Sequence, residues 1–71
     1  MSAEVKGVYP VTSLGPRHRE VRVEMSTGRK WIFRAEKGKV ALRLGPSVDE
    51  HRLEYKTARA AAVKALAEPK P

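Results

Sequence analysis

Arginine and lysine are the residues through which this chain could do chemistry. Four of them recur at alternate positions of segments rich in β-forming residues, namely Arg22, Lys30, Arg34 and Arg43. Because successive side chains of a strand point to opposite sides, this spacing gathers the four cations on one face of a sheet. A guanidinium there can contact phosphate or pair through two hydrogen bonds with guanine. The pattern therefore indicates recognition of a polyanion.

The charge of the whole chain agrees with this interpretation. Its 71 residues include 15 Lys or Arg and 8 Asp or Glu, which leaves a formal net charge of +7. Such a field attracts nucleic acid, so we expect a nucleic-acid partner, with DNA favoured over RNA. The alternative hypothesis is a regulatory interaction protein that docks on an acidic protein surface, which would respond to the same charge.

Further cations extend the expected binding site beyond the four on the face. Lys39 and Arg29 lie next to predicted tight turns, and Arg17 and Arg19 follow a loop predicted over residues 12–16. The full set of candidate nucleic-acid-binding residues is Arg22, Lys30, Arg34, Arg43, Lys39, Arg29, Arg17 and Arg19. We expect their contribution to be mainly electrostatic, with counterions released on binding.

No constellation of residues suggests catalysis. The chain has no cysteine, its two histidines lie far apart at positions 18 and 51, and its serines fall in turns or in the N-terminal tail. A serine nucleophile would therefore lack an evident base, and the histidines are interpreted as solvated imidazoles. We expect a protein that is not an enzyme and that carries no metal and no cofactor.

The elements that must position the cations begin with one clear strand. Residues 18–25 alternate apolar and charged side chains, and Ser26-Thr27-Gly28 then predicts a three-residue hairpin turn. This turn sets Val23 opposite Trp31 and Val21 opposite Phe33. It also sets Glu24 opposite Lys30 and Glu20 opposite Arg34, which predicts two cross-strand ion pairs.

A second turn at residues 36–39 predicts a third strand. A loop of two or four residues would keep Val40, Leu42 and Leu44 on the apolar face, and a three-residue loop would reverse them. With the former, the opposite face collects Arg22, Lys30, Ile32, Arg34, Ala41 and Arg43. Trp31 and Phe33, although interleaved with cations, are then predicted to pack in the core rather than to stack on bases.

The two ends of the chain are less regular. Val5 to Val11 is interrupted by Gly7 and Pro10 and predicts at best a short edge strand, and residues 51–55 could be another strand or an extended approach to a helix. Thr57 is a plausible N-cap for a helix over residues 58–67, which Pro69 ends. The expected fold is α+β: one domain with an antiparallel sheet of three to five strands, one C-terminal helix on its apolar face, and disordered tails at 1–3 and 68–71.

Two segments carry a resemblance to known families. Leu42-Arg43-Leu44-Gly45 and residues 55–61 resemble the last strand and the helix start of the DNA-binding domains of plant ethylene-response factors and of the arm-binding domains of phage-type integrases. This resemblance implies a three-stranded sheet that reads the major groove. Residues 46–53 depart from it, and a curved sheet of four or five strands with one helix, similar to dimeric single-strand-binding regulators, is the other arrangement considered.

The remaining expectations concern location and assembly. The longest apolar run, near Ala60 to Ala67, is far shorter than the roughly 20 residues that span a bilayer, and the first residues do not resemble a signal peptide. We therefore expect no membrane role and a cytoplasmic or nucleoid-associated location. A homodimer is plausible, because a core this small gains from being doubled.

Overall fold

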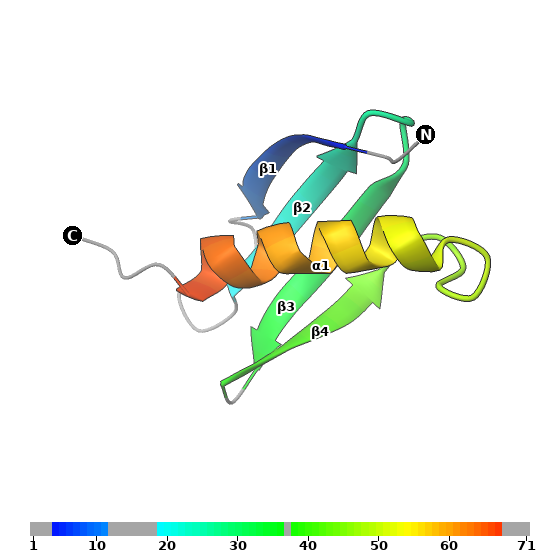
Figure 1. Cartoon of the computed structure of the whole chain (residues 1–71). Coiled ribbons are helices and arrows are strands. Elements are labelled where there is room, and N and C mark those ends of the chain that lie inside the picture. Colours follow the sequence, from blue (N-terminus) through cyan, green and yellow to red (C-terminus); the bar gives the residue numbers. More distant parts are fainter. Residues whose placement is uncertain (1–3, 12–18, 37, 68–71) are drawn as a thin grey trace.

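The chain folds as a four-stranded antiparallel sheet with one helix across it. The computed structural model describes residues 4–11, 19–36 and 38–67. Its elements are β1 (Val5–Val11), β2 (Arg19–Met25), β3 (Lys30–Glu36), β4 (Lys39–Leu44) and α1 (Arg52–Ala67). The strands lie in the order β1-β2-β3-β4, and α1 covers one face (Figure 1). This confirms the expected α+β class; the loop expected over residues 12–16 and both expected tails lie outside the described residues.

The central hairpin has the register that alternation predicts. Val21 is opposite Phe33, Val23 is opposite Trp31, and Gly28 has a φ of 94°, the left-handed conformation that glycine adopts without strain. The amide of Gly28 donates to the carbonyl of Met25 over 2.9 Å and closes the turn.

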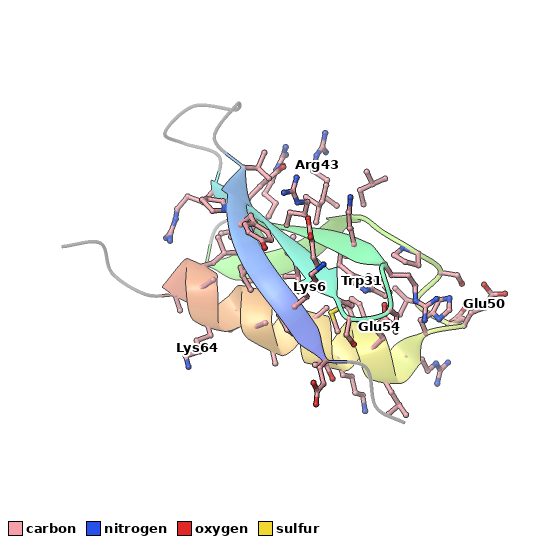
Figure 2. The ribbon with its side chains drawn as sticks, turned by 90° about the horizontal axis from the view of Figure 1, so that it is seen from above. Lys6, Trp31, Arg43, Glu50, Glu54 and Lys64 are labelled. Atoms are coloured by element: carbon pink, nitrogen blue, oxygen red, sulfur yellow. The ribbon has the colours of Figure 1, made fainter. Side chains whose placement is uncertain are left out.

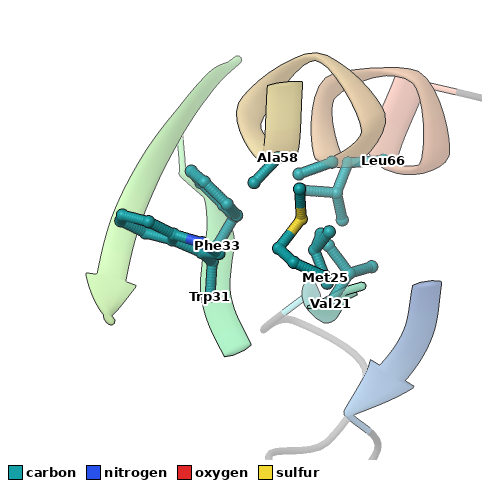
Figure 3. Close-up of a cluster of buried hydrophobic side chains, with 8 residues drawn as sticks. Val21, Met25, Trp31, Phe33, Ala58 and Leu66 are labelled. Carbon is teal, nitrogen blue, oxygen red and sulfur yellow. The ribbon is translucent and has the colours of Figure 1, made fainter. Parts of the chain in front are cut away.

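The core lies between this hairpin and the helix. Trp31 and Phe33 are fully buried, as predicted, and Tyr55 of α1 packs against both rings with centroid distances of 5.6 and 5.9 Å. The helix contributes mainly small side chains to the core. Its alanines allow the helix to lie close to the sheet. The buried apolar residues are Val21, Val23, Met25, Trp31, Phe33, Ala58, Ala62 and Leu66 (Figure 3).

The β3–β4 hairpin differs from the expected pattern at its far end. Glu36 pairs with Lys39, which confirms a two-residue turn, and Val40 and Leu42 lie on the helix side as predicted. The register then shifts between Ile32 and Phe33, so that Leu44 is opposite Ile32. The extra residue of such a bulge shifts the alternation, so that the side chain after it points to the opposite face of the sheet. The prediction that Leu44 faces the helix is therefore wrong, and its side chain is 66% exposed.

The helix begins earlier than predicted. Residues 51–55 are neither a strand nor an extended segment, since the helix starts at Arg52 and the amide of Tyr55 donates to the carbonyl of His51 over 2.8 Å. Thr57 is not an N-cap: it lies inside α1, and its hydroxyl donates to the carbonyl of Leu53. The predicted end is correct, because α1 ends at Ala67.

The remaining features concern β1 and the length of the helix. β1 is an edge strand with the predicted bounds and adds a fourth strand to the three that the family resemblance implied. α1 starts before the residues thought to mark a helix start in that resemblance. Within the described residues, no helix is long and apolar enough to cross a membrane.

Candidate functional site

The sheet face turned away from α1, here called the open face, gathers most of the predicted cations. The register places Tyr9, Arg22, Ile32 and Leu44 side by side across the four strands. Figure 2 shows Arg43 on the side of the sheet away from the helix. The fully described residues of the open face include Gly7, Tyr9, Val11, Glu20, Arg22, Glu24, Lys30, Ile32, Arg34, Lys39, Ala41, Arg43 and Leu44.

A buried carboxylate organises one half of this face. Glu20 accepts from Arg34 Nε over 2.7 Å, and Arg43 Nε lies 3.2 Å from the same oxygen, Oε2. The Glu20 side chain is 5% exposed, whereas that of Arg43 is 54% exposed. The predicted Glu20–Arg34 pair is therefore confirmed, and Arg43 joins it from β4. Two guanidiniums are held beside each other, with that of Arg43 largely open to solvent.

Arg22 occupies the middle of the face and has two neighbours. Its Nε lies 3.0 Å from Oε2 of Glu24, yet the geometry is not that of a hydrogen bond, and Nε is buried without an acceptor among the described residues. Its guanidinium carbon lies 5.2 Å from the ring centroid of Tyr9, a cation–π contact. Arg22 is thus placed by a carboxylate on its own strand and by a ring on β1.

Lys30 is opposite Glu24 as predicted, but the expected ion pair does not form in the described part of the chain. Glu24 pairs with Arg22 instead, and Lys30 is exposed. Lys39, opposite Glu36, lies on the same face. The open face therefore holds five cations and two carboxylates among the residues with described side chains, an excess of three positive charges. The face is basic, although less so than its arginine and lysine content alone suggests.

The other predicted site residues divide between the two faces. Lys39 is exposed where β4 begins and is opposite Glu36, which places it at the end of the open face. Arg19 is opposite Ala35 on the helix side, and Arg17 lies outside the described residues. Arg29 is drawn to the helix side, because its Nε donates to both carboxylate oxygens of Glu54 over 3.0 Å. The structure thus brings together Arg22, Lys30, Arg34, Lys39 and Arg43 but not Arg17, Arg19 or Arg29.

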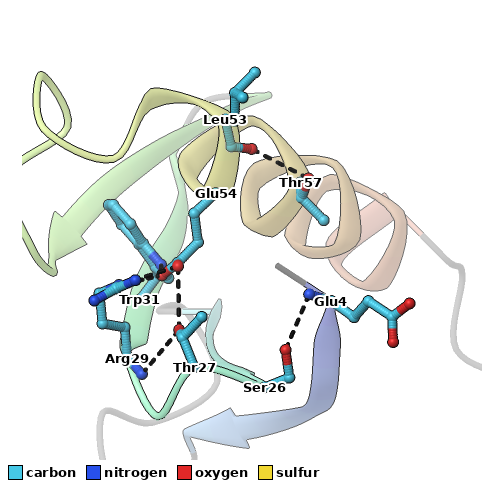
Figure 4. A network of polar contacts seen from close by, with 8 residues as sticks. All are labelled: Glu4, Ser26, Thr27, Arg29, Trp31, Leu53, Glu54 and Thr57. Atoms are coloured by element: carbon cyan, nitrogen blue, oxygen red, sulfur yellow. Dashed lines mark hydrogen bonds and ion pairs between the residues drawn. The ribbon is translucent and has the colours of Figure 1, made fainter. Parts of the chain in front are cut away.

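Glu54 is the centre of a second polar cluster, under the helix (Figure 4). Besides Arg29, it accepts from Trp31 Nε1 over 2.9 Å and from the hydroxyl of Thr27 over 3.1 Å. Burial raises the pKa of Glu54, but the hydrogen bonds from Trp31, Arg29 and Thr27 outweigh it, so the pKa lies below its ordinary value. The carboxylate is charged at neutral pH and joins the first turn of α1 to the β2–β3 hairpin.

Tyr9 is the residue of the open face that sequence reasoning left unassigned. Its ring lies over Gly7: a Cβ added to that glycine would come within 2.5 Å of the Tyr9 hydroxyl and 2.9 Å of its ring atoms. Tyr9 is 42% exposed. The spacing Gly7-x-Tyr9 in an edge strand, with an aromatic ring placed over a glycine on the same face, was the available signal.

The described residues include no cluster of metal ligands, and a hollow opens beside the cations of the open face. Among them, no three His, Asp or Glu side chains lie close enough together to hold a metal ion. A surface hollow of about 210 Å³ lies beside the guanidiniums, lined by Arg34, Ala41, Leu42 and Arg43. Its lining offers positive charge and apolar atoms.

Comparisons with protein-family models, with curated proteins and with solved structures find no match for this chain. Its function is therefore argued from its own residues.

Proposed function

We propose that this chain is a small, non-catalytic nucleic-acid-binding module, with DNA the favoured ligand, and that the open face is its binding surface. One observation carries the proposal. The sheet face that α1 leaves uncovered bears Arg22, Lys30, Arg34, Lys39 and Arg43 against two carboxylates among the residues with described side chains, in a chain of net charge +7. Such a surface attracts phosphates and releases their counterions on binding.

The arrangement of the arginines supports direct hydrogen bonds to a ligand in addition to long-range electrostatic attraction. Glu20 and Tyr9 restrain the guanidiniums of Arg43 and Arg22, so less side-chain entropy is lost when a ligand binds. A guanidinium can then meet a phosphate with two parallel hydrogen bonds. Restrained cations with one accessible side fit a ligand that carries phosphates at regular intervals.

The outer side of α1 is the competing surface. It also carries cations, namely Arg52, Lys56, Arg59 and Lys64, all exposed. The ion pair recorded for Arg52 joins it to Asp49 at 3.6 Å, and both side chains are largely solvated. Such a pair restrains its members little. We favour the open face because its cations are oriented and lie beside an exposed ring.

The proposal is tested by titrating labelled DNA with the protein at several salt concentrations and following fluorescence anisotropy. Wild-type affinity should fall steeply with salt, with a logarithmic slope of about 0.9 per phosphate contact on duplex and about 0.7 on single strands. The triple variant Arg22→Ala/Arg34→Ala/Arg43→Ala removes up to three contacts and should reduce the slope by roughly two to three.

A charge-matched control separates the face from the net charge. The variant Arg52→Ala/Lys56→Ala/Lys64→Ala also loses three positive charges, from the outer side of the helix, and should retain most of the binding. Equal losses in the two variants would refute the open face as the site. Absence of binding by the folded wild type at low salt would refute the nucleic-acid proposal and favour the acidic-protein alternative.

A further inference from the structure

The open face has a central row of mostly aromatic and aliphatic residues. From β1 to β4 this row, here called the stacking row, consists of Tyr9, Arg22, Ile32 and Leu44, each opposite the next in the register. Neighbouring strands lie about 4.8 Å apart, so the row is roughly 15 Å long. Three of its four members are aromatic or aliphatic, and two of these, Tyr9 and Leu44, are exposed.

The ring of Tyr9 is positioned by the glycine that precedes it on the same strand face. A Cβ at Gly7 would collide with its hydroxyl and ring atoms, so the ring lies along the strand and over the glycine backbone. The ring is 42% exposed, so part of it is open to a ligand. The guanidinium of Arg22 lies over the ring, 5.2 Å from its centroid, and is a second flat group of the kind on which bases stack.

Cations flank the stacking row on both sides. On β3, Lys30 lies two residues before Ile32 and Arg34 lies two residues after it, so both are on the same face as Ile32. Arg43 lies next to Leu44 at the bulge, beside the surface hollow. A flat, partly apolar row between two sets of cations matches a chain whose bases lie in the middle and whose phosphates lie at the edges.

This chemistry discriminates between the two forms of DNA. A duplex hides the flat sides of its bases inside the stack, so it would contact only the cations and would bring its phosphates toward Glu20 and Glu24. An unpaired strand exposes those flat sides, and stacking on an aromatic side chain strengthens its binding. The row gives a single strand contacts that a duplex cannot make.

We propose that the stacking row binds single-stranded nucleic acid by stacking unpaired bases on Tyr9 and Arg22, with the flanking cations on the phosphates. The inference rests on the proposed function, because it assigns the form of nucleic acid that the open face takes. The chemistry recognised is an unpaired base attached to a phosphate chain, whether the sugar is deoxyribose or ribose.

The test measures fluorescence anisotropy with labelled single-stranded DNA, single-stranded RNA, duplex DNA and an abasic DNA strand of equal length. Wild-type protein should bind one or both single strands at least tenfold more tightly than the duplex or the abasic strand. Tyr9→Ala should lose about tenfold on the preferred single strand, as expected for one stacked base, and much less on duplex, where it removes only the restraint on Arg22. Tyr9→Phe keeps the ring and should retain binding.

Folding is checked separately by the fluorescence of Trp31, the only tryptophan of the chain, which is buried on the other side of the sheet. Duplex binding equal to or tighter than single-strand binding, or unchanged single-strand affinity in folded Tyr9→Ala, overturns the stacking row and leaves the electrostatic proposal standing. No binding of any of the four oligonucleotides at low salt overturns both.

Discussion

The two sides of the sheet each contain a buried glutamate that contacts arginine, and the two serve different purposes. Glu54 and Glu20 have side chains that are each 5% exposed. The partners of Glu54 are the side chains of Thr27, Arg29 and Trp31, more than twenty residues away in sequence. Those of Glu20 are Arg34 and Arg43, on strands that the sheet already holds together.

This difference teaches that burial of a charge does not by itself identify a functional site. Among the described residues, Glu54 joins elements that otherwise meet mainly through the apolar core, so its loss should affect the fold. Glu20 joins side chains whose backbones are already fixed by strand pairing. Its main effect is on the direction in which two guanidiniums point, so its loss should affect ligand binding more than the fold.

The largest effect is expected from Glu54→Ala. This variant leaves the indole N–H of Trp31 buried without an acceptor and removes the partner of Arg29, which should destabilise the protein by roughly 2 to 4 kcal/mol. Thermal or urea unfolding followed by Trp31 fluorescence measures the loss. A change below about 0.5 kcal/mol, the range typical of surface substitutions, would show that Glu54 does not hold the helix.

The pH dependence of stability is expected to follow the same carboxylate. The pKa of Glu54 lies below its ordinary value in the folded protein, so the folded state favours the charged form. This contribution is present above the ordinary glutamate pKa of about 4.3 and is lost as pH falls through the lower, folded value. Melting temperatures between pH 7 and pH 3 should therefore fall more for the wild type than for Glu54→Gln. Parallel profiles would assign the acid sensitivity to other carboxylates.

The smallest effect on stability is expected from Glu20→Gln, which should also strengthen DNA binding. The amide keeps an acceptor for Arg34 but removes a negative charge from the open face, which should strengthen the attraction of a phosphate by roughly 1 kcal/mol, or about fivefold, at low salt. DNA titrations measure this gain. The control, Glu50→Gln, makes the same change of net charge at an exposed position before α1 and should leave affinity unaltered. Weaker DNA binding by folded Glu20→Gln would mean that orientation of the arginines outweighs their charge.

Much of the sheet could be predicted from local pattern. The alternation around Val21 and Val23, together with Gly28, is sufficient for the register of the central hairpin, because a one-residue slip would expose every apolar side chain. The same alternation gathers Arg22, Lys30 and Arg34 on one face. These predictions depend only on the period of a strand and the geometry of short turns.

The parts that were missed depend on contacts between distant segments. A charged residue at position 54 does not by itself suggest a buried helical position, because its partners Trp31 and Arg29 are distant in sequence. The start of the helix was therefore predicted several residues too late. The spacing of four from Glu54 through Ala58 and Ala62 to Leu66 was the available signal. Nothing local marks the bulge that turns Leu44 outward, and Tyr9 gains its position only from its neighbours Gly7 and Arg22.

The consecutive order of the strands has a consequence for the rate and sequence of folding. Every strand pairs with the next one along the chain, so the sheet forms by closing short loops, which costs little entropy. The β2–β3 hairpin alone carries Thr27, Arg29 and Trp31, the partners of Glu54. We therefore expect this hairpin to form first and the helix to pack onto it afterwards. Mutations in the hairpin should then slow folding, whereas mutations in α1 should mainly speed unfolding.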